Sequence, residues 1–125
     1  MFNAEKVKNE CAQWIRDFFE KNGKDCNAVV GISGGKDSSV AAAICVEALG
    51  KDRVIGVLMP NGQPPEAEAV QVVKYLGIDC HIIDIFDTVH SMHQTRSFEL
   101  TEQAIVNLPP RIRMSALYMV SQSLN

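Results

Sequence analysis

The sequence predicts an α/β protein in which a parallel sheet carries helices on both faces. Over residues 27–85, apolar runs of strand length alternate with segments of helical periodicity, in the order strand, helix, strand, helix, strand. The chain has 125 residues, which is the size of one domain, and 46% of them are hydrophobic. We therefore expect a single domain over residues 1–125, with an N-terminal helical part (1–24), the βαβαβ core (27–85) and a helical segment (86–125).

The first expected element is an amphipathic helix over residues 3–21. Apolar side chains recur there at spacings of three and four residues, which places them on one helix face. They are Val7, Cys11, Trp14, Ile15, Phe18 and Phe19. Asn3 stands where it can cap the first turn.

The core is expected to contain three buried strands and two helices. The strands are predicted over residues 27–32, 54–59 and 78–85, and the helices over residues 37–49 and 65–76. Gly50 and Gly77 follow the two helices as C-caps, and Pro65 suits a first helical turn. In such sheets ligands bind beyond the carboxyl ends of the strands.

Beyond residue 85 the pattern becomes helical. The expected helices cover residues 88–93, 98–106 and 111–123. The second of them should bury Leu100, Ala104 and Ile105. Pro109-Pro110 is expected to open the last helix, because proline is tolerated in a first turn and disrupts a helix interior.

Composition excludes several function classes. The net charge of −3 argues against a nucleic-acid-binding protein, and no apolar run is long enough to span a membrane, so the expected location is the cytoplasm. The four cysteines lack C-x-x-C spacing, so they are expected to be free thiols, with Cys45 packed in a helix face. His90 and His93 are interpreted as surface residues, and Asp84 and Asp87 as turn residues.

A glycine-rich stretch, Ser-Gly-Gly-Lys-Asp-Ser-Ser at residues 33–39, separates the first strand from an alanine-rich helix. Gly34 and Gly35 can adopt positive φ and have no Cβ to block a ligand. Successive amide N–H groups in such a turn bind anions, and so does the N-terminus of the helix that follows. The spacing matches neither a Walker A loop nor a dinucleotide fingerprint, yet its physical character predicts phosphate binding.

Asp37 would repel a bare phosphate, so we expect it to bind a Mg²⁺ ion carried by the phosphates. The alternative is a tight strand-to-helix turn, capped by Ser33 and Asp37, that binds no ligand. A generic Ser-Gly-Gly favours this turn, whereas the full string favours the phosphate site.

Residues 31–39, Gly-Ile-Ser-Gly-Gly-Lys-Asp-Ser-Ser, resemble the S-G-G-x-D-S signature of the PP-loop ATP pyrophosphatases, which split ATP between its α- and β-phosphates. Two further stretches resemble one branch of that superfamily, the ammonia-dependent NAD synthetases. They are Pro60-Asn61-Gly62-Gln63 after the second strand, and residues 107–125 with Arg111-Ile112-Arg113-Met114 and Tyr118. The resemblance covers essentially the whole chain and implies an adenine nucleotide alpha hydrolase-like, Rossmann-like fold.

The resemblance implies ATP-dependent amidation of deamido-NAD by ammonia to NAD, through an acyl-adenylate, with release of AMP and pyrophosphate. It implies that the ATP phosphates are held by Gly31, Ile32, Ser33, Gly34, Gly35, Lys36, Asp37 and Ser38. Asp37 would also bind Mg²⁺, and Arg111 would contact deamido-NAD. Lys36 fills a variable motif position and is given a modest role. No catalytic side chain is expected, because the reaction needs positioning and charge neutralisation.

Members of this family are homodimers, so a homodimer is expected, with Met114 and Tyr118 as packing residues. The family continues past the point that corresponds to residue 125, so we expect a domain truncated at its C-terminus, an incomplete sheet and part of an active site. Pro109-Pro110 replaces the usual small or polar residues, and residues 63–66 lack an aspartate common in that loop. Two alternatives remain open: another PP-loop adenylating enzyme (GMP-synthetase-like or tRNA-modifying), or a non-catalytic nucleotide-binding fragment.

Overall fold

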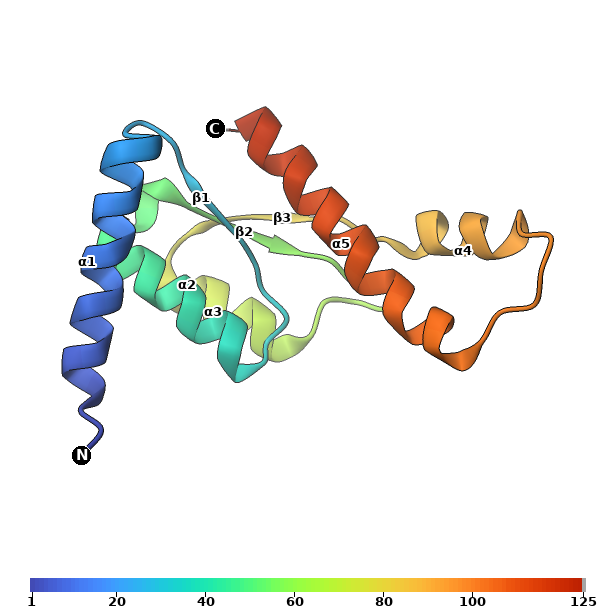
Figure 1. Cartoon of the computed structure of the whole chain (residues 1–125), viewed down its shortest axis with the longest axis horizontal. Helices are drawn as coiled ribbons and strands as arrows, with labels where there is room; N and C mark the ends of the chain where they lie inside the picture. Colours follow the sequence, from blue (N-terminus) through green and yellow to red (C-terminus); the bar gives the residue numbers. More distant parts are fainter. Residues whose placement is uncertain (125) are drawn as a thin grey trace.

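The computed structural model describes residues 1–124 and contains a parallel three-stranded sheet (Figure 1). Its strands are β1 (Ala28–Gly31), β2 (Val54–Leu58) and β3 (Asp79–Ile82), arranged in the order β1-β2-β3. Ala28 pairs with Val54, and Ile55 pairs with Asp79. Because all three strands run in the same direction, their carboxyl ends meet at one edge of the sheet.

Five α-helices are described: α1 (Ala4–Asn22), α2 (Lys36–Leu49), α3 (Ala67–Leu76), α4 (Phe86–Gln94) and α5 (Glu102–Leu124). A short 3₁₀ turn, Lys51–Arg53, precedes β2. The helices α2 and α3 pack on one face of the sheet, and α5 runs obliquely across the other face, as Figure 1 shows. This arrangement confirms the predicted α/β fold with helices on both faces.

The two faces of the sheet carry separate apolar clusters. Successive side chains of a strand point to opposite faces, so neighbours in sequence enter different clusters. The cluster under α2 and α3 contains Ala28, Ile32, Ala42, Val54, Leu58, Ala69 and Ile78. The cluster under α5 contains Ile55, Val57 and Val120, with Leu117 packed against it. All five residues of β2 are buried, because this strand is central in the described sheet.

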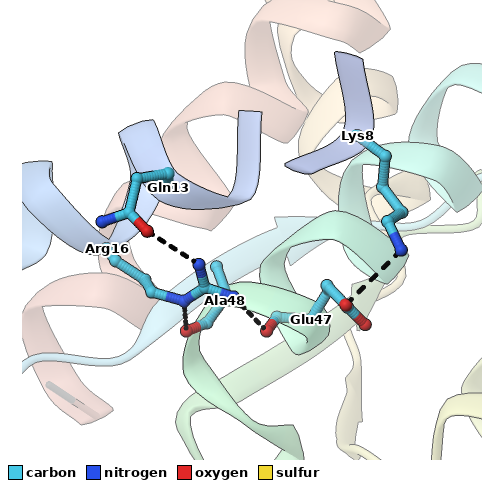
Figure 2. A network of polar contacts seen from close by, with 5 residues as sticks. All are labelled: Lys8, Gln13, Arg16, Glu47 and Ala48. Atoms are coloured by element: carbon cyan, nitrogen blue, oxygen red, sulfur yellow. Dashed lines mark hydrogen bonds and ion pairs between the residues drawn. The ribbon is translucent and has the colours of Figure 1, made fainter. Parts of the chain in front are cut away.

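Polar contacts attach α1 to the C-terminal turn of α2 (Figure 2). The guanidinium of Arg16 donates to the carbonyl oxygens of Glu47 at 3.2 Å and Ala48 at 3.1 Å. These carbonyls belong to the last helical turn, where no intrahelical donor remains. Lys8 lies 3.5 Å from the carboxylate of Glu47. The predicted cap is also present, since the Asn3 side chain accepts from the amide of Lys6 at 3.0 Å.

The core elements agree with the sequence prediction, with different ends. The helix predicted over residues 65–76 begins at Ala67, because Glu66 occupies the N-cap position with a non-helical ψ of 137°, which leaves Pro65 outside. The strand predicted over residues 78–85 ends at Ile82. Beyond Ile82, the chain still forms backbone hydrogen bonds with the end of β2 and the residues after it. Ile83 and Ile85 donate to the carbonyls of Leu58 and Pro60, each at 2.9 Å. Cys45 packs against the α2 and α3 cluster, as predicted.

The C-terminal helices differ more from prediction. One continuous helix, α5, replaces the two expected over 98–106 and 111–123, so Pro109-Pro110 lies inside a helix instead of opening one. The prolines remove the donors that would reach the carbonyls of Ile105 and Val106. Both of those residues are exposed, so water can reach this turn. Thr101 stabilises the actual start, because its hydroxyl accepts from the amide of Ala104 at 3.1 Å.

Side-chain burial in this segment also differs from prediction. Leu100 is half-buried, whereas Ala104 and Ile105 are exposed, so their predicted burial is wrong. His90 is exposed, but His93 is half-buried with its Nε2 enclosed, so the surface interpretation fails for His93. Within residues 1–124, no helix has both the length and the apolarity needed to cross a membrane.

Candidate nucleotide-binding site

A pocket of about 580 Å³ lies at the carboxyl edge of β1 and β2. Three segments build its walls: the residues after β1, the long loop after β2 with the start of α3, and one side of α5. The lining residues are Gly31, Ile32, Ser33, Leu58, Met59, Pro60, Asn61, Gln63, Pro64, Pro65, Glu66, Ala69, Pro110, Arg113, Met114 and Leu117. The predicted phosphate loop thus adjoins the pocket through Ser33.

Hydroxyl groups hold the loop between β1 and α2 in a tight turn. Ser38 Oγ accepts from the amide of Ser33 at 3.1 Å and lies 3.1 Å from Ser33 Oγ. Ser33 Oγ also accepts from the amide of Gly35 at 3.2 Å, and Ser39 Oγ donates to the Gly35 carbonyl at 2.7 Å. These bonds are all local, so residues 33–39 determine the shape of their own turn.

Gly34 is required by conformation and by space. Its φ is +89°, a value that residues with a Cβ rarely adopt. A Cβ built on it would lie 2.9 Å from the backbone nitrogen of Ala69 and 3.1 Å from Cβ of Glu68. The loop is therefore pressed against the first turn of α3, and the contact links two strand-to-helix connections at the same sheet edge.

Lys36 and Asp37 form the first turn of α2, whose N-cap is Gly35. Both side chains are exposed, and within residues 1–124 neither makes a hydrogen bond or ion pair. No group of three or more His, Cys, Asp and Glu residues in the described chain is arranged to hold a metal ion. Asp37 therefore belongs to no such group, and a carboxylate outside a larger cluster suits an ion already coordinated by phosphate oxygens.

The wall formed by α5 contains Arg113 rather than Arg111. Arg113 Nε donates to the carbonyl of Met59 at 2.9 Å, and its side chain is partly buried. Arg111 is exposed and does not line the pocket. The contact of Arg111 with deamido-NAD stays a prediction.

Helical spacing explains the difference between these arginines. The pocket-lining residues of α5 are Pro110, Arg113, Met114 and Leu117, which recur at three and four residues and share one face. Leu117 also contacts the sheet cluster, so this face is the one turned toward the sheet. The periodicity of the last helix was the signal in the sequence that could have placed Arg113 in the site.

Two residues with side-chain amides, Asn61 and Gln63, lie in the loop after β2 and line the pocket. Asp84, at the end of the β3 segment, accepts from the backbone amides of Gly62 and Phe86. This is the turn role expected for Asp84. The loop therefore has polar residues in the pocket although it lacks the aspartate.

Comparisons with known proteins agree on the kind of protein. The NAD synthase family matches residues 7–125. An NH(3)-dependent NAD(+) synthetase of Methanocaldococcus jannaschii is 40% identical over 131 residues, which cover 98% of this chain and 49% of the relative. The chain spans about half the length of the NH(3)-dependent relatives it matches.

Solved structures give the same result. An NH3-dependent NAD synthetase from Campylobacter jejuni, in complex with nitrate, superposes with a TM-score of 0.88 at 29% identity, over 99% of this chain and 54% of that one. A glutamine-dependent NAD+ synthetase from Acinetobacter baumannii, in complex with ADP, gives a TM-score of 0.84 at 27% identity, over 95% of this chain and 24% of that one.

Proposed function

The chain belongs to the NAD synthase family, and we propose that it takes part in the ATP-dependent amidation of deamido-NAD by ammonia. In this reaction the nicotinate carboxylate attacks the α-phosphate of ATP and releases pyrophosphate. Ammonia then displaces AMP from the acyl-adenylate and forms NAD. Because the chain spans about half of its relatives, it carries one part of the site for these steps.

The observation that carries the proposal is the loop at residues 33–39, which serine hydroxyls hold in a tight turn beside the pocket. The positive φ of Gly34 and the start of α2 give the loop the character of an anion-binding turn. We assign the ATP phosphates to residues 31–38, including the lesser role of Lys36. Because Ile32 and Ser33 line the pocket, a nucleotide whose phosphates are held by the loop would extend its nucleoside into the space beside Met59 and the loop after β2.

The metal fits the same assignment. Asp37 offers an exposed carboxylate at the start of α2, beside the loop proposed for the phosphates. Mg²⁺ bound there would neutralise charge on the phosphates during attack and release. The protein would contribute position, hydrogen-bond donors and one oxygen ligand, with no side chain as nucleophile or general base.

Deamido-NAD is assigned to the α5 side of the site, with Arg111 as its contact. The guanidinium donates in a fixed fork that matches a carboxylate or a phosphate. We further propose a homodimer. Tyr118 is 69% exposed, and Met114 is 60% exposed although it lines the pocket, so both leave surface for the expected packing against a second copy.

Titration with ATP and Mg²⁺ tests the assignment. Asp37→Ala should weaken the binding of Mg·ATP by about tenfold or more, since it removes a charged ligand. Asp52→Ala is the matched control, because Asp52 is an exposed aspartate in the 3₁₀ turn that precedes β2, at the opposite end of the strand from the pocket. Equal affinity of the wild-type and Asp37→Ala proteins would refute the metal role.

Product analysis separates the alternatives. AMP release that depends on deamido-NAD, with NAD formed when ammonia is added, supports the proposed reaction. AMP release that is independent of deamido-NAD would indicate another adenylating enzyme. Mg·ATP binding without AMP release would indicate a nucleotide-binding fragment.

A further inference from the structure

One carboxylate joins the loop after β2 to the beginning of α4. Asp84 Oδ1 accepts from the amide of Gly62 at 3.0 Å and from the amide of Phe86 at 2.9 Å. Hydrogen bonds to an ionised acceptor are stronger than neutral ones. Asp84 does not itself line the pocket.

Gly62 is held by a second contact with the same segment. Its φ is +79°, and a Cβ built on it would lie 2.8 Å from Cδ2 of Phe86. The loop therefore lies directly on the Phe86 ring, which a larger residue at position 62 would prevent. The ring also stacks on His90, with 5.4 Å between the ring centroids. The loop after β2 thus packs on an aromatic pair, Phe86 and His90, in the first turns of α4.

The hydrogen bond from Gly62 to Asp84 affects the pocket because of its place in the loop. Backbone bonds fix the loop only as far as Pro60, whose carbonyl accepts from Ile85 at 2.9 Å. The next attachment is the bond from Gly62 to Asp84, 22 positions away in sequence. Asn61 and Gln63, the neighbours of Gly62, both line the pocket.

We propose that Asp84 is a positioning residue, which sets the affinity of the pocket for the nucleoside part of ATP by holding the loop at Gly62. It does so without touching the ligand. The choice of ATP as the ligand rests on the proposed function, whereas the restraint of the loop does not. Removal of the carboxylate should release residues 61–63 and leave the phosphate-binding turn intact.

Amide hydrogen exchange tests the restraint without any ligand. In Asp84→Ala, the amide of Gly62 should exchange about tenfold faster, the factor expected for one lost charge-assisted bond. Asp84→Asn keeps an acceptor oxygen and should restore protection to within about threefold of wild type. Asp87→Ala is the matched control, because it removes an equal charge from the exposed first turn of α4. Unchanged exchange at Gly62 in Asp84→Ala would overturn the proposal.

Binding of two magnesium complexes tests the consequence. For Mg·ATP, Asp84→Ala should raise Kd about tenfold, while Asp84→Asn and Asp87→Ala stay near wild type. For Mg·tripolyphosphate, which has no nucleoside, all four proteins should bind equally. A parallel loss for both probes, or faster exchange with unchanged Mg·ATP affinity, would overturn the positioning role. Absence of Mg·ATP binding by the wild type would refute the proposed function, and the exchange result would still decide the restraint.

Discussion

Two walls of the pocket are stabilised in different ways. In the turn between β1 and α2, the bonds join residues at most five positions apart, such as Ser33 to Ser38 and Gly35 to Ser33. On the facing side, the bonds join Gly62 to Asp84 and Met59 to Arg113, which are 22 and 54 positions apart. The first wall takes its shape from its own sequence, whereas the second depends on the assembled fold.

The largest effect should follow from Gly34→Ala, because Gly34 is where the local turn touches α3. The substitution combines a φ of +89° with a Cβ at 2.9 Å from the backbone nitrogen of Ala69. We expect a loss of about 2–4 kcal/mol in the free energy of unfolding, measured by urea denaturation.

Gly35→Ala is the control for that experiment. Gly35 has an ordinary φ of −74°, and its added Cβ would meet only Ser33 Oγ at 3.4 Å. The cost should stay below about 1 kcal/mol. Equal losses for the two substitutions would show that the turn is less tightly packed on α3 than its geometry indicates.

Arg113→Ala tests the wall that depends on the fold. It removes the bond from Nε to the Met59 carbonyl and leaves a partly buried acceptor without a protein partner. The expected loss is about 1–2 kcal/mol in the free energy of unfolding. Arg111→Ala removes the same charge from an exposed position on the same helix and should change stability by less than about 0.5 kcal/mol. A reversed order would mean that the two arginines have been assigned to the wrong sides of α5.

Arg111→Ala also tests substrate recognition. If Arg111 contacts deamido-NAD, its removal should weaken binding of that dinucleotide about tenfold, which corresponds to about 1.4 kcal/mol. The affinity for Mg·ATP should stay unchanged, since Arg111 lies outside the pocket. Calorimetric titration with each ligand measures both. Unchanged affinity for deamido-NAD would remove Arg111 from the site.

The smallest effect concerns the thiol of Cys45, which does not line the pocket. Burial raises the pKa of Cys45 above its ordinary value of 9.0. The unfolded chain therefore loses this proton at lower pH than the folded chain, so the contribution of Cys45 to stability falls as pH rises above 9.0.

Denaturation at about pH 8 and about pH 10 measures this effect as the difference between wild type and Cys45→Ala, which cancels the other titrating groups. Alkylation gives a second measure, because the exposed Cys11 should react faster than Cys45. Equal reaction rates would contradict the burial of Cys45.

The same contrast explains what the sequence could predict. The alternation of strands and helices, the cap at Asn3 and the loop at residues 33–39 all depend on neighbours in the chain, and the structure confirms the elements and the cap. The pocket wall could not be predicted in this way, because Arg113 acquires its role from Met59 on another element. The segment after β3 depends on another element in the same way, because Ile83 and Ile85 donate to the carbonyls of Leu58 and Pro60.

For the helix containing Pro109-Pro110, by contrast, a prediction from local preference is wrong. The local preference of proline predicts a helix boundary at Pro109-Pro110, yet α5 continues through both residues. Beyond them, Ala116 and Val120 are buried, Val120 in the cluster with Ile55 and Val57 of the sheet, and this packing outweighs two lost backbone bonds. Tertiary packing thus outweighed the helix-breaking preference of two consecutive prolines.

The uninterrupted course of α5 has a consequence for how the helix opens. Two consecutive positions without an amide donor remove two rungs from its hydrogen-bond ladder, between the exposed turn at Ile105 and Val106 and the turn that carries Arg113. Fraying that begins at Glu102 therefore meets this gap before it reaches Arg113, Met114 and Leu117 in the pocket wall. The first two turns of α5 can unwind and re-form while the segment behind the prolines stays docked on the sheet.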